Sequence, residues 1–190
     1  MVKSTRKSAR DRILEKASEL FYQEGIQKVG IDRIIAESGV AKMSLYNHFK
    51  SKDVLIAEVL KQRDESWRSW FIETLASYSS EPKERLLAIF DVLKLWFEQP
   101  NFRGCAFINA TIELGREEHP AYQIVLRHKQ SIYSYILELV KASQLKDPES
   151  LARQLFLLIE GAIVVAMREK KSTAAEDAKV IAQVLLTRES

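Results

Sequence analysis

Apolar residues recur every three or four positions along nearly the whole chain, the spacing that gathers them on one face of an α-helix. No stretch stands out with the strict alternation of apolar and polar residues that marks a half-buried strand. Clusters of Gly, Pro and Ser interrupt the pattern, as expected where helices end and begin. The pattern predicts an all-α fold of about nine helices, at residues 8–23, 31–38, 42–48, 52–78, 82–98, 104–116, 119–142, 148–170 and 173–186.

Two of these predicted helices, residues 31–38 and 42–48, are short and closely spaced. Gly39 lies in the turn between them, where a left-handed backbone costs glycine no strain. In the second helix, Leu45 and Phe49 are four residues apart and face inward, so the polar and aromatic residues around them face outward. Two short helices joined by a glycine-containing turn are typical of a helix-turn-helix.

The charge of the chain is distributed unevenly. Residues 1–63 hold 13 Lys and Arg against 8 Asp and Glu, a net charge of +5, whereas residues 64–190 hold 16 against 18, a net charge of −2. A basic first third suits a polyanionic partner, although a solvated charged surface would give the same totals. Because this basic segment contains the helix-turn-helix, we predict a DNA-binding domain over residues 1–52 and a larger helical domain over residues 53–190.

The composition indicates a soluble globular protein. Of the 190 residues, 46% are hydrophobic and 29% are charged. Glu160 and Gly161 interrupt the most apolar stretch, so we expect no membrane helix. The basic N-terminus leads into no apolar segment, so we expect no secretory signal. The single cysteine, Cys105, excludes an internal disulfide and suits a reducing cytoplasm.

The sequence lacks the motifs of enzymes and metal sites. It contains no Gly-rich phosphate loop, zinc-binding helix motif or nucleophile elbow. The three histidines, His48, His119 and His128, form no closely spaced set with the cysteine. We therefore expect neither catalysis nor a bound metal or other cofactor.

The outward side of residues 42–48 offers two kinds of DNA contact. Contacts to phosphates position a protein on the duplex, and contacts to base edges read its sequence. We predict phosphate or sugar contacts from Lys42, Tyr46, His48 and Lys52. We predict base-edge contacts from Met43, Ser44 and Asn47, because an amide can bridge adenine and an apolar group can meet a thymine methyl. Any packed surface helix also exposes residues, and the helix-turn-helix pattern is what favours DNA contacts.

A set of residues over about fifty positions at the N-terminus has a specific spacing. The set comprises Gly25, Ile35-Ala36, Gly39-Val40, Leu45-Tyr46-Asn47-His48-Phe49 and Ser51-Lys52. In these residues the chain resembles the TetR family of bacterial one-component transcriptional regulators. Two positions depart from the family pattern: Gly30 and Ala41 stand where a capping Ser or Thr is common. Loss of a side-chain cap costs roughly 0.5–2 kcal/mol of local stability.

The resemblance implies a function and an assembly. TetR-like proteins pair their last two helices, here about residues 148–188, with those of a second copy to form a four-helix dimer interface. There is also a physical reason to expect a homodimer. One recognition helix binds DNA too weakly, whereas two that lie about one helical turn of DNA apart can read a palindrome. We therefore expect a repressor that a small, mostly apolar effector releases from a double-stranded DNA operator.

The resemblance also implies an apolar effector cavity in the helical body. That body is rich in aromatic residues, which ordinary core packing would explain equally well. Ligand pockets combine apolar walls with a few polar groups. Our candidates for effector contacts are Trp67, Trp70, Phe71, Phe90, Cys105, Asn109, Glu113 and His128. Cys105 is either an inert small apolar residue or, with the cationic Arg103 nearby, a thiolate that senses electrophiles.

The missing caps at Gly30 and Ala41 leave a second hypothesis open. The chain would then be a helical ligand-binding or protein-interaction module whose DNA binding is weakened or lost.

Overall fold

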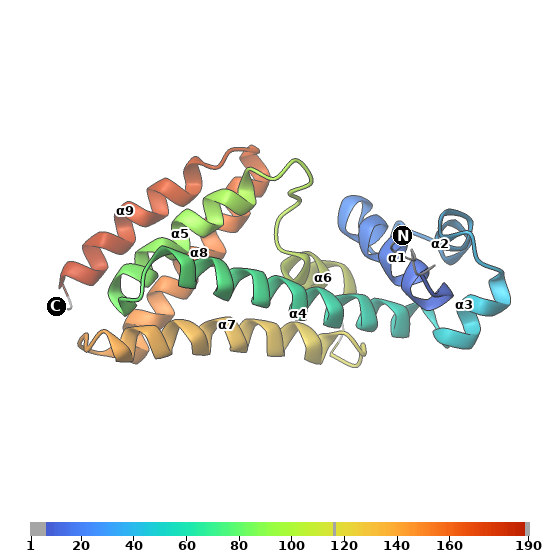
Figure 1. The fold of residues 1–190 in the computed structure, drawn as a ribbon, viewed down its shortest axis with the longest axis horizontal. Coiled ribbons are helices and arrows are strands. Elements are labelled where there is room, and N and C mark those ends of the chain that lie inside the picture. Colours follow the sequence, from blue (N-terminus) through green and yellow to red (C-terminus); the bar gives the residue numbers. More distant parts are fainter. Residues whose placement is uncertain (1–6, 116, 189–190) are drawn as a thin grey trace, which may run out of the picture. The chain divides into compact units, whose positions relative to one another are not determined.

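The computed structural model describes residues 7–115 and 117–188, and every regular element in these ranges is an α-helix (Figure 1). The predicted all-α fold is confirmed. The helices are α1 (Ala9–Glu24), α2 (Ile31–Ser38), α3 (Lys42–His48), α4 (Lys52–Tyr78), α5 (Pro82–Phe97), α6 (Ala106–Leu114), α7 (Tyr122–Ala142), α8 (Pro148–Glu169) and α9 (Thr173–Arg188).

Most helix boundaries lie within two residues of those predicted, because the chain marks them with capping residues. The Asp147 carboxylate accepts the N–H of Ser150 at the start of α8, and the Ser51 hydroxyl accepts the N–H of Val54 at the start of α4. Gly39 follows α2 in the left-handed conformation, with φ 61° and ψ 38°. These are the positions where such residues stabilise helix ends.

Two helices start later than predicted. The expected start at residue 119 lies three residues before α7, because the His119 Nδ1 accepts the N–H of Ala121 and the His119 carbonyl accepts the N–H of Tyr122. These bonds make a turn in place of a helical first turn. At α6 the helix begins at Ala106, after Gly104 with its φ of 81°, and not at residue 104.

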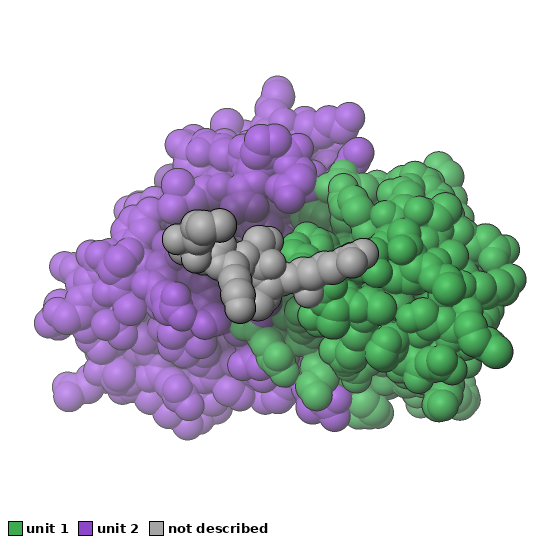
Figure 2. Space-filling model, turned by 45° about the vertical axis from the view of Figure 1, so that its right-hand side comes forward, with its two compact units in different colours: residues 1–65, 106–126 green, residues 66–105, 127–190 purple. Residues whose placement is uncertain are grey.

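The described structure divides into two compact units (Figure 2). Unit 1 comprises residues 1–65 and 106–126, and unit 2 comprises residues 66–105 and 127–190. Unit 1 therefore joins α1 to α3 and the first half of α4 to α6, a helix that follows some forty residues later in the chain. The functional boundary predicted near residue 52 stays a prediction.

The core of unit 1 is built from one face of each N-terminal helix. α1 buries Ile13, Leu14, Ala17, Leu20 and Phe21, the residues at helical spacing. Ile34 from α2 and Leu45 from α3 are fully buried beside that face. Burying such side chains contributes about 1.5–3 kcal/mol each, which is what holds three short helices together.

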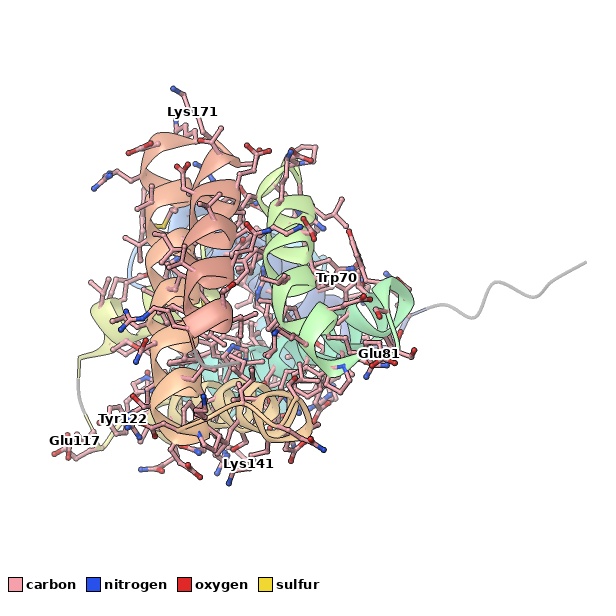
Figure 3. The ribbon with its side chains drawn as sticks, turned by 90° about the vertical axis from the view of Figure 1, so that its left-hand side faces the viewer. Trp70, Glu81, Glu117, Tyr122, Lys141 and Lys171 are labelled. Carbon is pink, nitrogen blue, oxygen red and sulfur yellow. The ribbon has the colours of Figure 1, made fainter. Side chains whose placement is uncertain are left out.

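Unit 2 contains α5, α8 and α9, with α8 and α9 side by side (Figure 3). Lys171 lies in the turn that connects these two helices. The ammonium group of Lys179 on α9 lies 2.6 Å from the carboxylate of Asp91 on α5, and Lys94 of α5 pairs with Glu176 of α9. α5 and α9 are thus joined by ion pairs as well as by apolar packing.

α8 is the one described helix that is long and apolar enough to cross a membrane by length and composition. Its buried residues include Leu155 and Ile159, and its Glu160 forms an ion pair with Lys129 of α7 at 2.7 Å. These contacts make α8 a packing helix of unit 2.

Candidate nucleic-acid interface

The turn between α2 and α3 is held by a side chain from α1. One guanidinium nitrogen of Arg12 donates hydrogen bonds to the backbone carbonyls of Ser38 and Gly39, each at 3.1 Å. The Gly39 N–H donates to the carbonyl of Ile35, also at 3.1 Å. The turn of the predicted helix-turn-helix is therefore fixed by α1 as well as by its own glycine.

α3 is anchored by Leu45 and Phe49, which are 0% and 1% exposed. The guanidinium of Arg10 lies over the ring of Phe49, 5.5 Å from its centroid. With one side of the helix held in this way, its other side faces solvent, as the sequence predicts.

The predicted DNA contacts lie on that outward side, and two of them are less exposed than the others. Met43 is 72% exposed and Tyr46 is 39% exposed, and both present large side chains to solvent. The exposed residues of this set are Lys42, Met43, Tyr46, Asn47 and His48. Ser44 and Lys52 are half-buried. The arrangement is that of a recognition helix, and the individual DNA contacts stay predictions.

Lys52 is the more enclosed of the two lysines among the predicted contacts. Its ammonium nitrogen lies 6.0 Å from the centroid of the Phe21 ring. Burial lowers the pKa of Lys52, while the nearby carboxylates of Asp53 and Glu113 act to raise it. Lys42 is therefore the better placed of the two to reach a phosphate.

Lys42 is held by an acidic neighbour on α2. Its ammonium nitrogen lies 3.1 Å from a carboxylate oxygen of Asp32, whose side chain is 85% exposed. This hydrogen bond raises the pKa of Lys42. Arg33 is engaged too, with Glu37 at 2.9 Å and with Glu24. Carboxylates thus partly neutralise the positive charge on this surface.

The structure shows that α2 and α3 both lack a side-chain cap, as the sequence indicates. Gly30 precedes α2 and Ala41 precedes α3, both with extended backbone and neither with a side-chain hydrogen bond to the helix. The first N–H groups of both helices therefore lack the oxygen partner that Ser or Thr would supply.

An aromatic cluster lies in unit 2, around Trp67 of α4. The indole of Trp67 stacks on Phe71, with ring centroids 4.8 Å apart, and lies edge-to-face with Trp96 and His128, whose ring centroids are 5.2 Å and 5.6 Å away. Trp70 lies 6.1 Å from Trp67. The structure therefore brings together four predicted effector contacts: Trp67, Trp70, Phe71 and His128.

The outer surface of α8 and α9 carries an apolar groove of about 420 Å³. Leu157 and Ile181, one from each helix, line it and are 73% and 51% exposed. Its other lining residues are Gln154, Leu158, Gly161, Ala162, Val165, Ala174, Asp177, Ala178 and Leu185. An apolar groove with exposed aliphatic side chains is typical of a surface that a partner covers.

Known proteins share both parts of this architecture. Residues 13–59 match the model of bacterial regulatory proteins of the tetR family, and residues 82–181 match that of the tetracyclin repressor-like C-terminal domain. The chain is 33% identical to a TetR-family transcriptional regulator from Streptomyces coelicolor, with a TM-score of 0.88 over 96% of both chains. The chain belongs to the TetR family. It is accordingly a helix-turn-helix transcriptional regulator, and ligand-responsive repression is the typical role of such proteins.

Other relatives agree over nearly the full length. A TetR transcriptional regulator from Chloroflexus aurantiacus is 25% identical, with a TM-score of 0.84 over 95% of both chains. The HTH-type transcriptional regulator YjdC of Escherichia coli is 20% identical over 93% of both chains. Both relatives are named as transcriptional regulators.

The remaining predicted effector contacts of this TetR-family chain lie in different places. Phe90 is 1% exposed on α5. Cys105 is 5% exposed, and its sulfur lies 3.5 Å from the ammonium nitrogen of Lys129. Asn109 and Glu113 belong to unit 1, where they line a cleft of only about 20 Å³, the size of one water molecule. In the described part of the chain, no group of three His, Cys, Asp or Glu residues is placed to hold a metal ion.

The sequence did not predict the observed contacts of two residues, Arg12 and Glu113, that link segments of unit 1 of this TetR-family chain. Arg12 lies off the apolar stripe of α1 and gives no sign in the sequence that it reaches Ser38 and Gly39. Glu113 was expected beside an effector, yet its carboxylate accepts the backbone N–H of Gln27. Hydrogen bonds between segments 26 and 86 residues apart leave no periodic signal.

Proposed function

We propose that the chain is a homodimeric, cytoplasmic repressor that a small, mostly apolar effector releases from a palindromic operator. The observation that carries the proposal is the outward side of α3, where Lys42, Met43 and Tyr46 project from a helix anchored by Leu45 and Phe49. A helix of this kind enters the major groove with its side chains at the base edges. The 33% identical relative from Streptomyces coelicolor supports a role in transcription.

The groove on α8 and α9 supports dimerisation. Exposed Leu157 and Ile181 cost free energy in water, and a second copy of the same groove would cover them. Small residues in the groove, Gly161, Ala162 and Ala178, permit close approach of helices. A four-helix interface of two α8 and two α9 helices would set the distance between the two recognition helices.

The aromatic cluster in unit 2 supports an apolar effector. The indole N–H of Trp67 is buried and has no hydrogen-bond partner among the described residues. A buried donor without a partner costs about 1–3 kcal/mol, and a ligand that offers an acceptor would recover that free energy. Aromatic walls with one unpaired donor fit a ring-bearing molecule that carries an oxygen acceptor.

The effector can release DNA only through a difference in affinity. It must bind more tightly to a conformation that binds the operator weakly. α4 contains both Lys52 and Trp67, so it is the element we expect to change between the two conformations.

The test is operator binding by Lys42→Ala and Tyr46→Ala variants over a series of salt concentrations. Each lost phosphate contact lowers the dependence of log affinity on log salt by about 0.9. We expect Lys42→Ala to weaken binding and to lower that slope by about one, and Tyr46→Ala to weaken binding with little change in slope. Lys171→Ala, which removes an exposed lysine in the α8–α9 turn, is the matched control. Wild-type affinity and slope in both variants would refute these contacts.

The uncapped starts of α2 and α3 favour one alternative, a helical ligand-binding or protein-interaction module with weakened or lost DNA binding. That alternative predicts dimerisation and effector binding but no selection of DNA from a random pool. DNA selection therefore separates the two functions.

A further inference from the structure

Glu113 joins the end of α6 to the turn between α1 and α2. The backbone N–H of Gln27 donates to the Glu113 Oε2 at 2.9 Å, and the side-chain amide of Gln27 donates to the backbone carbonyl of Glu113 at 3.0 Å. Both residues lie in unit 1. Two hydrogen bonds thus link one residue of the turn to one residue of α6.

Gly25 gives the carboxylate room to make this contact. It ends α1 with a φ of 98°, a conformation that favours glycine, and a Cβ there would lie 3.1 Å from the Glu113 Oε2. A side chain at residue 25 would therefore both strain the turn and crowd the carboxylate. Ile26 and Val29, 5% and 0% exposed, fix the apolar side of the same turn.

The start of α2 depends on what precedes it. Gly30 supplies no side-chain cap, so α2 lacks the local hydrogen bond that usually fixes a first turn. The turn that Glu113 holds is the segment leading directly into α2. A hydrogen bond to a carboxylate is roughly twice as strong as one between neutral groups, which suits this task.

We propose that Glu113 is a positioning residue for DNA binding. Its carboxylate fixes the α1–α2 turn, and through that turn it fixes the orientation of α2 and α3 toward the operator. This role replaces the effector contact expected for Glu113 and rests on the DNA binding of the proposed function.

The test compares Glu113→Ala, Glu113→Gln and Glu117→Ala in the full-length chain, with the operator fragment selected by the wild type. Removing a negative charge would by itself tighten binding to DNA. We expect Glu113→Ala to bind about 5- to 10-fold more weakly instead, because the turn loses its charged acceptor. Glu113→Gln keeps an oxygen acceptor and stays within about threefold of wild type. Glu117 is exposed beyond the end of α6 (Figure 3). Glu117→Ala removes the same charge, and we expect it not to weaken DNA binding.

Hydrogen exchange at the backbone N–H of Gln27 supplies a readout that does not depend on DNA. We expect exchange about 10-fold faster in Glu113→Ala and a few-fold faster in Glu113→Gln, whose neutral acceptor is weaker. If the Glu113→Ala variant does not fold, the exchange rate of the same backbone N–H in Glu113→Gln tests the proposal. Wild-type exchange at Gln27 in the variants, or equal weakening of DNA binding by Glu117→Ala, would overturn the proposal. A wild type that selects no DNA would refute the proposed function, while the exchange measurement would still test the contact.

Discussion

Single side chains set both the stability and the charge of the DNA-binding surface. Arg12 holds the turn between α2 and α3 through two backbone carbonyls. Asp32 holds Lys42, the most exposed lysine of the predicted contacts, by a hydrogen bond between neighbouring helices. Because Asp32 is itself exposed, it opposes any phosphate that approaches Lys42. We therefore expect Asp32 to weaken the electrostatic attraction of this surface for DNA.

Asp32→Asn should tighten DNA binding. The variant removes a negative charge beside Lys42 and frees its ammonium group for a phosphate, so we expect a gain of a few-fold that shrinks as salt is raised. Fluorescence anisotropy with a labelled operator measures the effect.

Glu65→Gln is the control for Asp32→Asn, because it removes an exposed charge on α4. Asp32 also lies in the first turn of α2, where its charge stabilises the helix by about 0.3–1 kcal/mol, so thermal unfolding should be recorded alongside. Unchanged or weaker binding by a folded Asp32→Asn variant would show that Asp32 does not restrain Lys42.

Helix starts were predictable where a cap bonds within its own first turn, and were mispredicted where another local hydrogen bond takes the place of that turn. Asp147 and Ser51 fixed the starts of α8 and α4, since each cap acts within its own first turn. At α5 the helix starts at the predicted residue 82 although Glu81 before it forms no side-chain cap, and the Ser79 hydroxyl donates to the Glu84 carboxylate. His119 takes the N–H of Ala121 and delays α7.

The site was predictable only as far as local spacing determines it. The outward residues of α3 could be predicted from the spacing of Leu45 and Phe49, because one helix face determines the other. The roles of Arg12 and Glu113 could not, because their partners lie far away in the sequence.

Ala41→Ser should stabilise α3. Ala41 has the extended backbone of an N-cap, with φ −71° and ψ 145°, but no oxygen to accept a helix N–H. A serine there should raise the free energy of unfolding by about 0.5–2 kcal/mol. Urea denaturation followed by circular dichroism measures it.

Ala36→Ser is the comparison for Ala41→Ser, because Ala36 is exposed within α2, where serine is a poorer helix former than alanine. The same small loss of stability in both variants would mean that α3 gains nothing from a cap.

The whole chain combines two compact units, and each carries one half of the proposed function. Unit 1 presents α3 and is held together by Arg12 and Glu113. Unit 2 holds the aromatic cluster and the groove of α8 and α9. α4 and α7 contribute residues to both units, so neither unit is a continuous piece of chain.

Leu157→Glu should break the dimer. Leu157 is 73% exposed in the groove, and a carboxylate buried there against a second copy would be desolvated without a partner. We expect the dimer to weaken at least about 100-fold, about 2.7 kcal/mol, and operator binding to fall with it. Analytical ultracentrifugation reports the mass.

Leu95→Glu on α5, where the leucine is 47% exposed outside the groove, is the control for Leu157→Glu and should stay dimeric. A dimer in both variants would place the interface elsewhere.

We expect a dimer of this chain to read a palindrome with two copies of α3. Selection of bound DNA from a random pool tests it most directly, with the purified wild-type protein. We predict an inverted repeat whose half-sites are about one helical turn apart, roughly 34–36 Å. Enrichment of a single unrepeated site, or of no sequence at all, would contradict the claim.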